Sequence, residues 1–205
     1  MSSESRLLRL RWTLSSAAGL VVGLAAAVAL GAPIETVVGA MLVTPILTGI
    51  VGAVFGTSQW VLLRRRLENA RWWIPASAAG LGIGLAGGVV LVEQVGRALT
   101  GGQVNVRLLS VPARAGSMAV VGLVSGLALG AAQWWILRRQ HPRTAKAWLW
   151  GSALAFTVSL FVSSLLADLV FGGLTALPGF IAFVLAAGLL AGAMTANQAA
   201  RLGSA

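Results

Sequence analysis

Six long apolar segments follow one another along the chain, separated by short polar or basic stretches. Their approximate bounds are 13–32, 36–62, 72–95, 113–137, 148–171 and 178–197. Each is near or above the roughly 20 residues that an α-helix needs to cross a bilayer. The apolar residues form continuous runs and do not alternate with polar ones, so the pattern predicts membrane-spanning helices and not the strands of a barrel. The expected fold class is an all-α integral membrane protein with six transmembrane helices.

A stretch of the second segment returns in the fourth. Residues 52–65 read GAVFGTSQWVLLRR and residues 126–139 read GLALGAAQWWILRR. The sixth segment carries a weaker copy in Gly188, Gly192 and Thr195, in which Thr replaces Gln and the Trp is gone. Self-similarity at a long period indicates a repeated supersecondary unit.

The first, third and fifth segments share a second pattern, a Trp followed at fixed spacing by three small residues. The copies are Trp12, Ser16, Gly19, Gly23; Trp73, Ser77, Gly80, Gly84; and Trp148, Ser152, Ala155, Ser159.

Together the two patterns predict a single membrane domain, 1–205, built of three tandem helical hairpins at about 8–64, 71–139 and 146–202. Two spans return each unit to the same side, so the units share one orientation, and a pseudo-threefold six-helix bundle about the membrane normal follows. Stripes of small residues predict close helix packing, with a glycine-lined conduit as the alternative.

Composition agrees with a membrane protein, since 58% of the residues are hydrophobic and 10% are charged, against about 25% charged in soluble proteins. Twelve of the fifteen Lys and Arg residues flank one side of the predicted spans. This positive-inside bias places both termini in the cytoplasm, N-in and C-in. It also favours contact with anionic lipids on that face over a nucleic-acid site, despite a formal charge of +10.

The Q-W-x-x-L-R-R signature resembles a feature of bacterial membrane proteins of unassigned role. The resemblance implies a multi-pass protein of the bacterial plasma (inner) membrane and implies no mechanism.

Two polar positions recur near the predicted cytoplasmic side, one on the odd and one on the even segments. They are Ser16, Ser77 and Ser152 on the odd segments and Gln59, Gln133 and Thr195 on the even ones. Both sets lie within about two helical turns of the interface, at similar depth. We expect them to hydrogen-bond between helices and so to fix the register of the bundle. The alternative is a polar pocket that opens to the cytoplasm.

All eight tryptophans lie at the predicted cytoplasmic ends of the spans, where indoles and arginines anchor a protein at the interface. The expected anchors are Trp12, Trp60, Trp72, Trp73, Trp134, Trp135, Trp148 and Trp150, with Arg64, Arg65, Arg138 and Arg139. The alternative is a docking surface for anionic lipid or for a cytoplasmic protein, because Trp and Arg are common in binding hot spots.

Acidic residues at the predicted outer ends are Glu35, Glu93 and Asp168, one per unit. Each is expected to be a solvated charge near a helix end, with Glu93 paired to Arg97 four residues on; a ring that attracts cations is the alternative. Glu35 is expected to lie in the first turn of the second helix, after a turn at Pro33.

Chemistry-bearing groups are scarce elsewhere. The chain has no Cys, and its one His, His141, lies in a predicted loop without ligand companions. No nucleophile with a base, no carboxylate pair and no metal cluster is found inside the segments, so we expect no catalytic residue, no metal, no cofactor and no enzyme activity. In the long outer connection, 96–113, Val104, Val106 and Leu108 alternate with polar residues and predict a short strand or a segment on the membrane surface.

Two functions remain open. The first is a non-enzymatic scaffold or accessory subunit that packs with lipids or other membrane proteins. The second is a transporter or channel for a small solute or ion, with a cytoplasm-facing polar pocket. Ion-coupled carriers usually hold an ionisable group near the midplane, and the predicted spans have none there.

Overall fold

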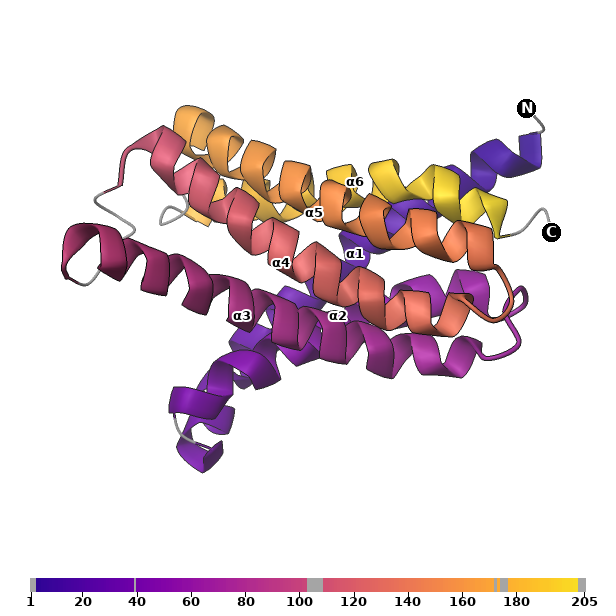
Figure 1. Ribbon diagram of the computed structural model, residues 1–205, viewed down its shortest axis with the longest axis horizontal. Helices are drawn as coiled ribbons and strands as arrows, with labels where there is room; N and C mark the ends of the chain where they lie inside the picture. Colours follow the sequence, from indigo (N-terminus) through magenta and orange to yellow (C-terminus); the bar gives the residue numbers. More distant parts are fainter. Residues whose placement is uncertain (1–2, 39, 103–108, 172, 174–176, 203–205) are drawn as a thin grey trace.

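The computed structural model describes residues 3–38, 40–102, 109–171, 173 and 177–202. Within them the chain is all-helical (Figure 1), as the hydropathy pattern predicts. The helices are α1 (Ser3–Val38), α2 (Ala40–Leu63), the short 3-10 helix η1 (Ala70–Trp72), α3 (Trp73–Thr100), α4 (Val111–Leu137), α5 (Pro142–Phe171) and α6 (Leu177–Arg201). Six of them are long and apolar enough to cross a membrane. The fold is that of a multi-pass membrane protein.

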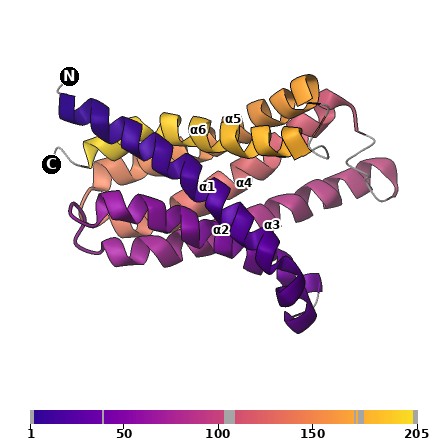
Figure 2. The same cartoon turned by 180° about the vertical axis from the view of Figure 1, so that it is seen from behind.

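The six long helices pack in chain order. Each contacts the helix before it and the helix after it, and α1 returns to pack along α6, which closes the series (Figure 2). Every helix therefore lies between two others, and the bundle has a centre that all six surround.

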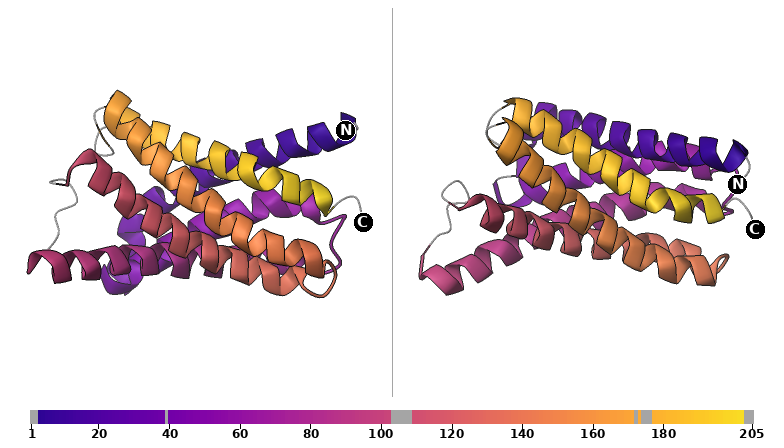
Figure 3. Two further views of the ribbon diagram at one scale, coloured as in Figure 1. Left: turned by 45° about the horizontal axis from the view of Figure 1, so that its top comes forward. Right: turned by 90° about the horizontal axis from the view of Figure 1, so that it is seen from above.

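The two ends of the bundle differ in shape. Both chain termini and the α2–α3 and α4–α5 connections lie at one end, which we call the arginine-rich end because residues 64–66, 71, 138 and 139 are there (Figure 1). At the opposite end α1 and α2 turn away from α5 and α6, so the helices fan out (Figures 1 and 3). The packing that holds the bundle together is concentrated toward the arginine-rich end.

Glycines allow the helix backbones to approach closely. A Cβ atom on Gly126 would lie 2.5 Å from Ser152 O and 2.7 Å from Ala153 Cα, and one on Gly84 would lie 2.6 Å from Ser125 Cα. No side chain fits at such distances. The close approach matters because lipid chains are as apolar as the helix surfaces, so helix association in a membrane depends on tight van der Waals contact.

The structure differs from the sequence-based expectation at Pro33. The predicted turn is absent, since α1 continues through Pro33 to Val38 and α2 begins at Ala40. A proline inside a helix removes one hydrogen bond and is tolerated at that cost, and here the break between the two helices comes after Val38. Glu35 consequently lies near the C-terminus of α1 and not in the first turn of α2. The predicted strand at Val104 to Leu108 lies outside the described residues.

The glycine contacts predict opposite results for two substitutions in one helix. Gly126→Ala forces α4 away from α5 and lowers the free energy of unfolding by about 1–3 kcal/mol. Gly116→Ala is the matched control, because nothing lies within 4 Å of a Cβ at that position, and Ala is the better helix former. Denaturant unfolding in detergent measures both variants. Equal effects of the two substitutions would contradict close packing at Gly126.

Candidate functional site

Three buried tryptophans fill the bundle centre at the arginine-rich end. Trp12, Trp73 and Trp148 stand near or at the starts of the membrane-spanning parts of α1, α3 and α5, and none is more than 1% exposed. Trp148 packs edge to face against both others, with ring centroids 5.6 Å from Trp12 and 5.4 Å from Trp73. Edge-to-face geometry is the favoured arrangement of aromatic pairs. These three predicted anchors are therefore buried inside the protein, whereas Trp72, Trp135 and Trp150 are exposed.

Each buried indole donates its hydrogen to a polar side chain on an even helix. Trp73 Nε1 donates to Gln59 Oε1 at 3.0 Å, and Trp148 Nε1 donates to Gln133 Oε1 at 2.8 Å. Trp12 Nε1 donates to the hydroxyl of Thr195 at 3.0 Å and so joins α1 to α6. An indole N–H in an apolar interior is costly without an acceptor, which explains why a polar residue stands at this depth.

The glutamines complete the layer through their amide nitrogens. Gln59 Nε2 donates to Ser16 Oγ at 3.3 Å, and Gln133 Nε2 donates to Ser77 Oγ at 2.9 Å. The sequence pattern predicts hydrogen bonds between the two sets of residues, and the structure adds which serine pairs with which glutamine. Both amide ends of each glutamine are therefore engaged, and the side chains are 3% and 1% exposed.

Thr195 makes a different set of contacts from the glutamines. Its hydroxyl accepts from Trp12 and donates back along its own helix to Ala191 O at 2.8 Å. The α5–α6 contact is bridged instead one turn further on, where Gln198 Nε2 donates to Ala147 O at 3.0 Å. Since Thr is two heavy atoms shorter than Gln in reach, a neighbouring residue supplies the amide that the third signature copy lacks.

Serines of the layer pack against glycines of the neighbouring even helix. A Cβ on Gly56 would meet Ser77 Cβ at 2.6 Å, one on Gly130 would meet Ser152 Cβ at 3.1 Å, and one on Gly192 would meet Ser16 Cβ at 3.0 Å. The structure thus brings all six predicted layer residues, Ser16, Ser77, Ser152, Gln59, Gln133 and Thr195, into buried helix contacts. Sequence reasoning missed the indole donors, although a Trp at the start of each odd span was the signal.

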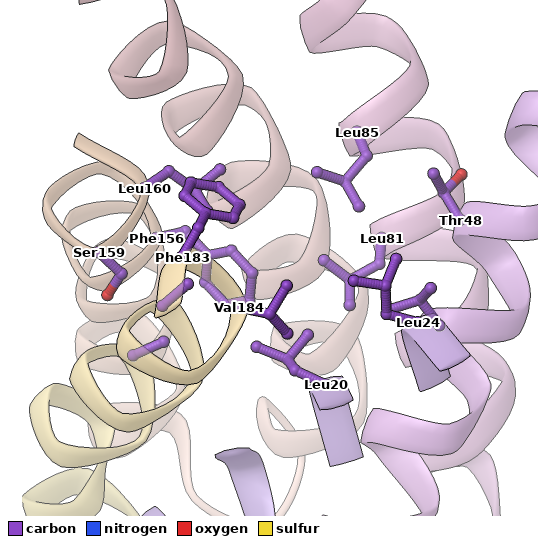
Figure 4. A pocket seen from close by; sticks show the side chains of 13 residues that line it. Leu20, Leu24, Thr48, Leu81, Leu85, Phe156, Ser159, Leu160, Phe183 and Val184 are labelled. Atoms are coloured by element: carbon purple, nitrogen blue, oxygen red, sulfur yellow. The ribbon is translucent and has the colours of Figure 1, made fainter. Parts of the chain in front are cut away.

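An apolar cavity of about 160 Å³ lies in the bundle beyond this layer, toward the opposite end. Leu20, Leu24 and Leu81 face Phe156 and Phe183 across it (Figure 4). Phe156 also packs edge to face against Phe55, with the ring centroids 6.2 Å apart. The walls of the cavity are mostly Leu, Val and Phe, with Thr48 and Ser159 as the polar residues of the lining, so the cavity suits apolar matter better than water.

The acidic residues of the opposite end lie in three different environments. Asp168 is buried, with 2% of its side chain exposed, and accepts a hydrogen bond from Arg114 Nε at 2.9 Å; the expectation of a solvated charge is wrong here. Glu93 pairs with Arg97 at 3.3 Å on the helix surface, as predicted. Glu35 is exposed on α1. The sequence could not reveal the ion pair of Asp168, because its partner lies on another helix.

Several buried oxygens on α5 have no hydrogen-bond partner in the described part of the chain. They are the hydroxyls of Ser159, Ser163 and Ser164 and Asp168 Oδ1. The four residues are spread around half of the circumference of α5, so their oxygens do not all point into one space. Among the residues described, no group of three or more His, Cys, Asp or Glu is close enough to hold a metal ion.

The hydrogen bonds of the layer predict a measurable coupling between helices. Gln133→Leu removes the acceptor of Trp148 and the donor to Ser77, and it lowers the free energy of unfolding by about 1–3 kcal/mol. In a double-mutant cycle with Trp148→Phe, which keeps an aromatic ring but removes the N–H, the two effects are less than additive by about 0.6 kcal/mol. Denaturant unfolding of the four proteins in detergent gives the coupling. Strict additivity would show that the bond contributes nothing.

The two ion pairs predict unequal costs for the loss of a carboxylate. Asp168→Ala leaves the Arg114 guanidinium mostly buried and unpaired, so unfolding becomes easier by about 3 kcal/mol, the low end for a broken buried pair. Glu93→Ala is the control and costs under about 1 kcal/mol, because its pair is half exposed. Thermal unfolding in detergent distinguishes them, and similar midpoints for both variants would refute the difference in burial.

No protein-family model, no curated protein and no solved structure matches this chain.

Proposed function

We propose that this protein is a non-enzymatic scaffold or accessory subunit of the membrane, which packs with lipids or with other membrane proteins. The observation that carries the proposal is the bonded layer at the arginine-rich end. Gln59 and Gln133 use both amide ends on neighbouring helices, and three tryptophan rings fill the space beside them. A layer so engaged leaves a solute few polar groups to bind. The proposal assigns no catalytic residue, metal or cofactor.

The proposed architecture is three tandem hairpins, 8–64, 71–139 and 146–202, related by a pseudo-threefold axis along the membrane normal. Two sets of contacts support it, because each recurs at corresponding positions of the units. They are the hydrogen bonds from the indoles of the odd helices to the even helices, and the serine–glycine contacts of Ser16, Ser77 and Ser152.

The proposed orientation places the arginine-rich end in the cytoplasm, with N-in and C-in topology in a bacterial plasma membrane. Twelve of the fifteen basic residues lie in segments that belong to this end, and cytoplasmic loops carry such an excess. The bacterial assignment rests on the resemblance of the Q-W-x-x-L-R-R signature.

One observation favours the alternative, a small-solute or ion transporter or channel. The cavity of about 160 Å³ lies where the helices begin to fan out, and its lining includes Ser159, whose hydroxyl has no partner in the described chain. For transport, a path would have to continue through the bonded layer to the arginine-rich end. Labelling from each side of the membrane separates the two proposals.

Cysteine labelling provides that test, since the natural chain has no cysteine. We expect Ser16→Cys, in the centre of the layer, to resist a membrane-impermeant maleimide from both sides. Glu68→Cys and Gly102→Cys, at exposed positions of the two ends, report orientation, and we expect reaction from the cytoplasm for the first and from outside for the second. Mass spectrometry of intact cells and inverted vesicles measures the modification.

Two outcomes would count against the proposal. Reaction of Ser16→Cys from both sides, with the two reporters still confined to one side each, would reveal an aqueous path and support transport. Reversed labelling of the reporters would reject the orientation alone.

A further inference from the structure

A groove at the arginine-rich end lies between the start of α3 and the end of α4. It consists of two adjoining hollows that share Trp72, Trp135 and Ile136. The first, of about 190 Å³, is completed by Asn69 and Arg139; the second, of about 240 Å³, is completed by Pro75, Ala76 and Ala132. The groove is thus polar at its mouth and apolar along the helices.

The walls of the groove are two exposed indoles. Trp72 is 50% exposed and Trp135 is 55% exposed, whereas the three central tryptophans are buried. The small side chains of Ala76 and Ala132 lie between them and leave the space open. Indoles with an apolar face and a polar edge are favoured at the headgroup level of a bilayer.

Positive charge surrounds the mouth. The guanidinium of Arg71 lies 5.9 Å from the centre of the Trp72 ring, and that of Arg138 lies 5.9 Å from the centre of the Trp135 ring. Arg139 lines the mouth itself. In the described part of the chain no carboxylate lies within 4 Å of these three guanidiniums, since both recorded ion pairs are at the opposite end. Glu68 is the nearest acidic residue in sequence to the mouth, so the excess charge there is positive.

From this arrangement we propose that the groove is a binding site for one anionic phospholipid. The phosphate meets Arg139 and the Asn69 amide, and one acyl chain lies along Ala76 and Ala132 between the indoles. Guanidinium matches phosphate by paired hydrogen bonds, and an ion pair gains strength where a membrane excludes water. The change from polar mouth to apolar wall follows the order of groups in a phospholipid. A soluble anion would use the mouth alone and leave the apolar wall unexplained.

The site belongs to the second unit. The residues that correspond to Trp72 are Arg11 and Ala147, and those that correspond to Trp135 are Val61 and Asn197. Neither of the other units therefore offers two indoles around such a groove. This inference rests on the proposed function only in placing the chain in a membrane; it does not require that the protein be a scaffold.

Titration of the purified protein with phosphatidylglycerol in detergent, followed by native mass spectrometry, tests the proposal. We expect one phosphatidylglycerol to bind in preference to phosphatidylcholine. Arg139→Gln weakens this binding about tenfold, the equivalent of about 1.4 kcal/mol. Arg65→Gln is the matched control, because it removes the same charge at the corresponding position of the first signature copy and leaves affinity unchanged.

A second variant tests the apolar half of the groove. Ala132→Leu fills the space between the indoles without altering charge, and at a partly exposed helix position it leaves the fold intact. It lowers phosphatidylglycerol binding as well, while Trp150→Ala, a change at an exposed indole outside the groove, does not.

Three results would overturn the site. Equal losses for Arg139→Gln and Arg65→Gln would indicate diffuse charge attraction, and undiminished binding in Ala132→Leu would remove the acyl chain from the groove. Competition by inorganic phosphate at equal potency would identify a free-anion site. If the titration shows no phosphatidylglycerol binding, only the lipid site is rejected and the scaffold proposal is unaffected. If cysteine labelling reveals an aqueous path, the scaffold proposal is rejected and the lipid site is unaffected.

Discussion

A buried indole N–H has to be matched by an acceptor, and the arrangement of the arginine-rich end depends on that requirement. No more than 1% of each of these tryptophans is exposed, so each donates its N–H to an oxygen of the adjacent even helix. The amide nitrogens of the two glutamines also carry hydrogens, which they donate to serines of the preceding helix. Each glutamine therefore joins three helices. Close packing at Gly56 and Gly130 brings those helices near enough for the bonds to form.

The contrast between the two ends of the bundle follows from where these bonds lie. Lipid supplies no hydrophobic force between apolar helices, so helices separate where neither small residues nor hydrogen bonds hold them. The layer and the serine–glycine contacts hold the arginine-rich end. At the opposite end the ion pair of Asp168 with Arg114 joins α4 to α5 alone, and α1 and α2 turn away from the rest (Figure 1). The apolar cavity lies between the tightly packed arginine-rich end and the end where the helices separate.

The number of spans and the common depth of the layer were predictable because they depend on local periodicity. Apolar runs determine where helices form, and a polar residue at a constant offset from an anchor determines its depth. The serines of the odd segments and the polar residues of the even segments could therefore be placed at one level, but which serine bonds to which glutamine could not be named. Trp72 and Trp73 are adjacent and chemically identical, yet one is half exposed and the other buried. The repeat separates them, because only Trp73 shares a helix face with Ser77 and Gly80. Whether that face points to lipid or to the bundle centre depends on how the six helices assemble, so the burial of Trp73 did not follow from the sequence.

Contacts between distant segments that do not follow the repeat were beyond the same reasoning. Glu93 finds Arg97 within one helix, so spacing predicts the pair, whereas Asp168 finds Arg114 across two helices, 54 positions away. Pro33 misled for a different reason: proline favours the start of a helix, but it can also lie inside one at the loss of a single hydrogen bond, as it does in α1. For Asp168 and for Pro33 the outcome depends on the folded structure, and the sequence around each residue does not reveal it.

The energy of the bonded layer bears on the choice between scaffold and transporter. Alternating access would open the arginine-rich end and break five hydrogen bonds between side chains, at about 0.6 kcal/mol each. Separating the two tryptophan ring pairs adds about 0.5–1.5 kcal/mol for each. The total, about 4–6 kcal/mol, reduces an open state to a population of roughly one in a thousand or less. A solute could offset that cost only through contacts made in the open state alone. The layer provides amides and hydroxyls for such contacts but no charge, so a neutral or weakly polar solute would have little with which to drive the change.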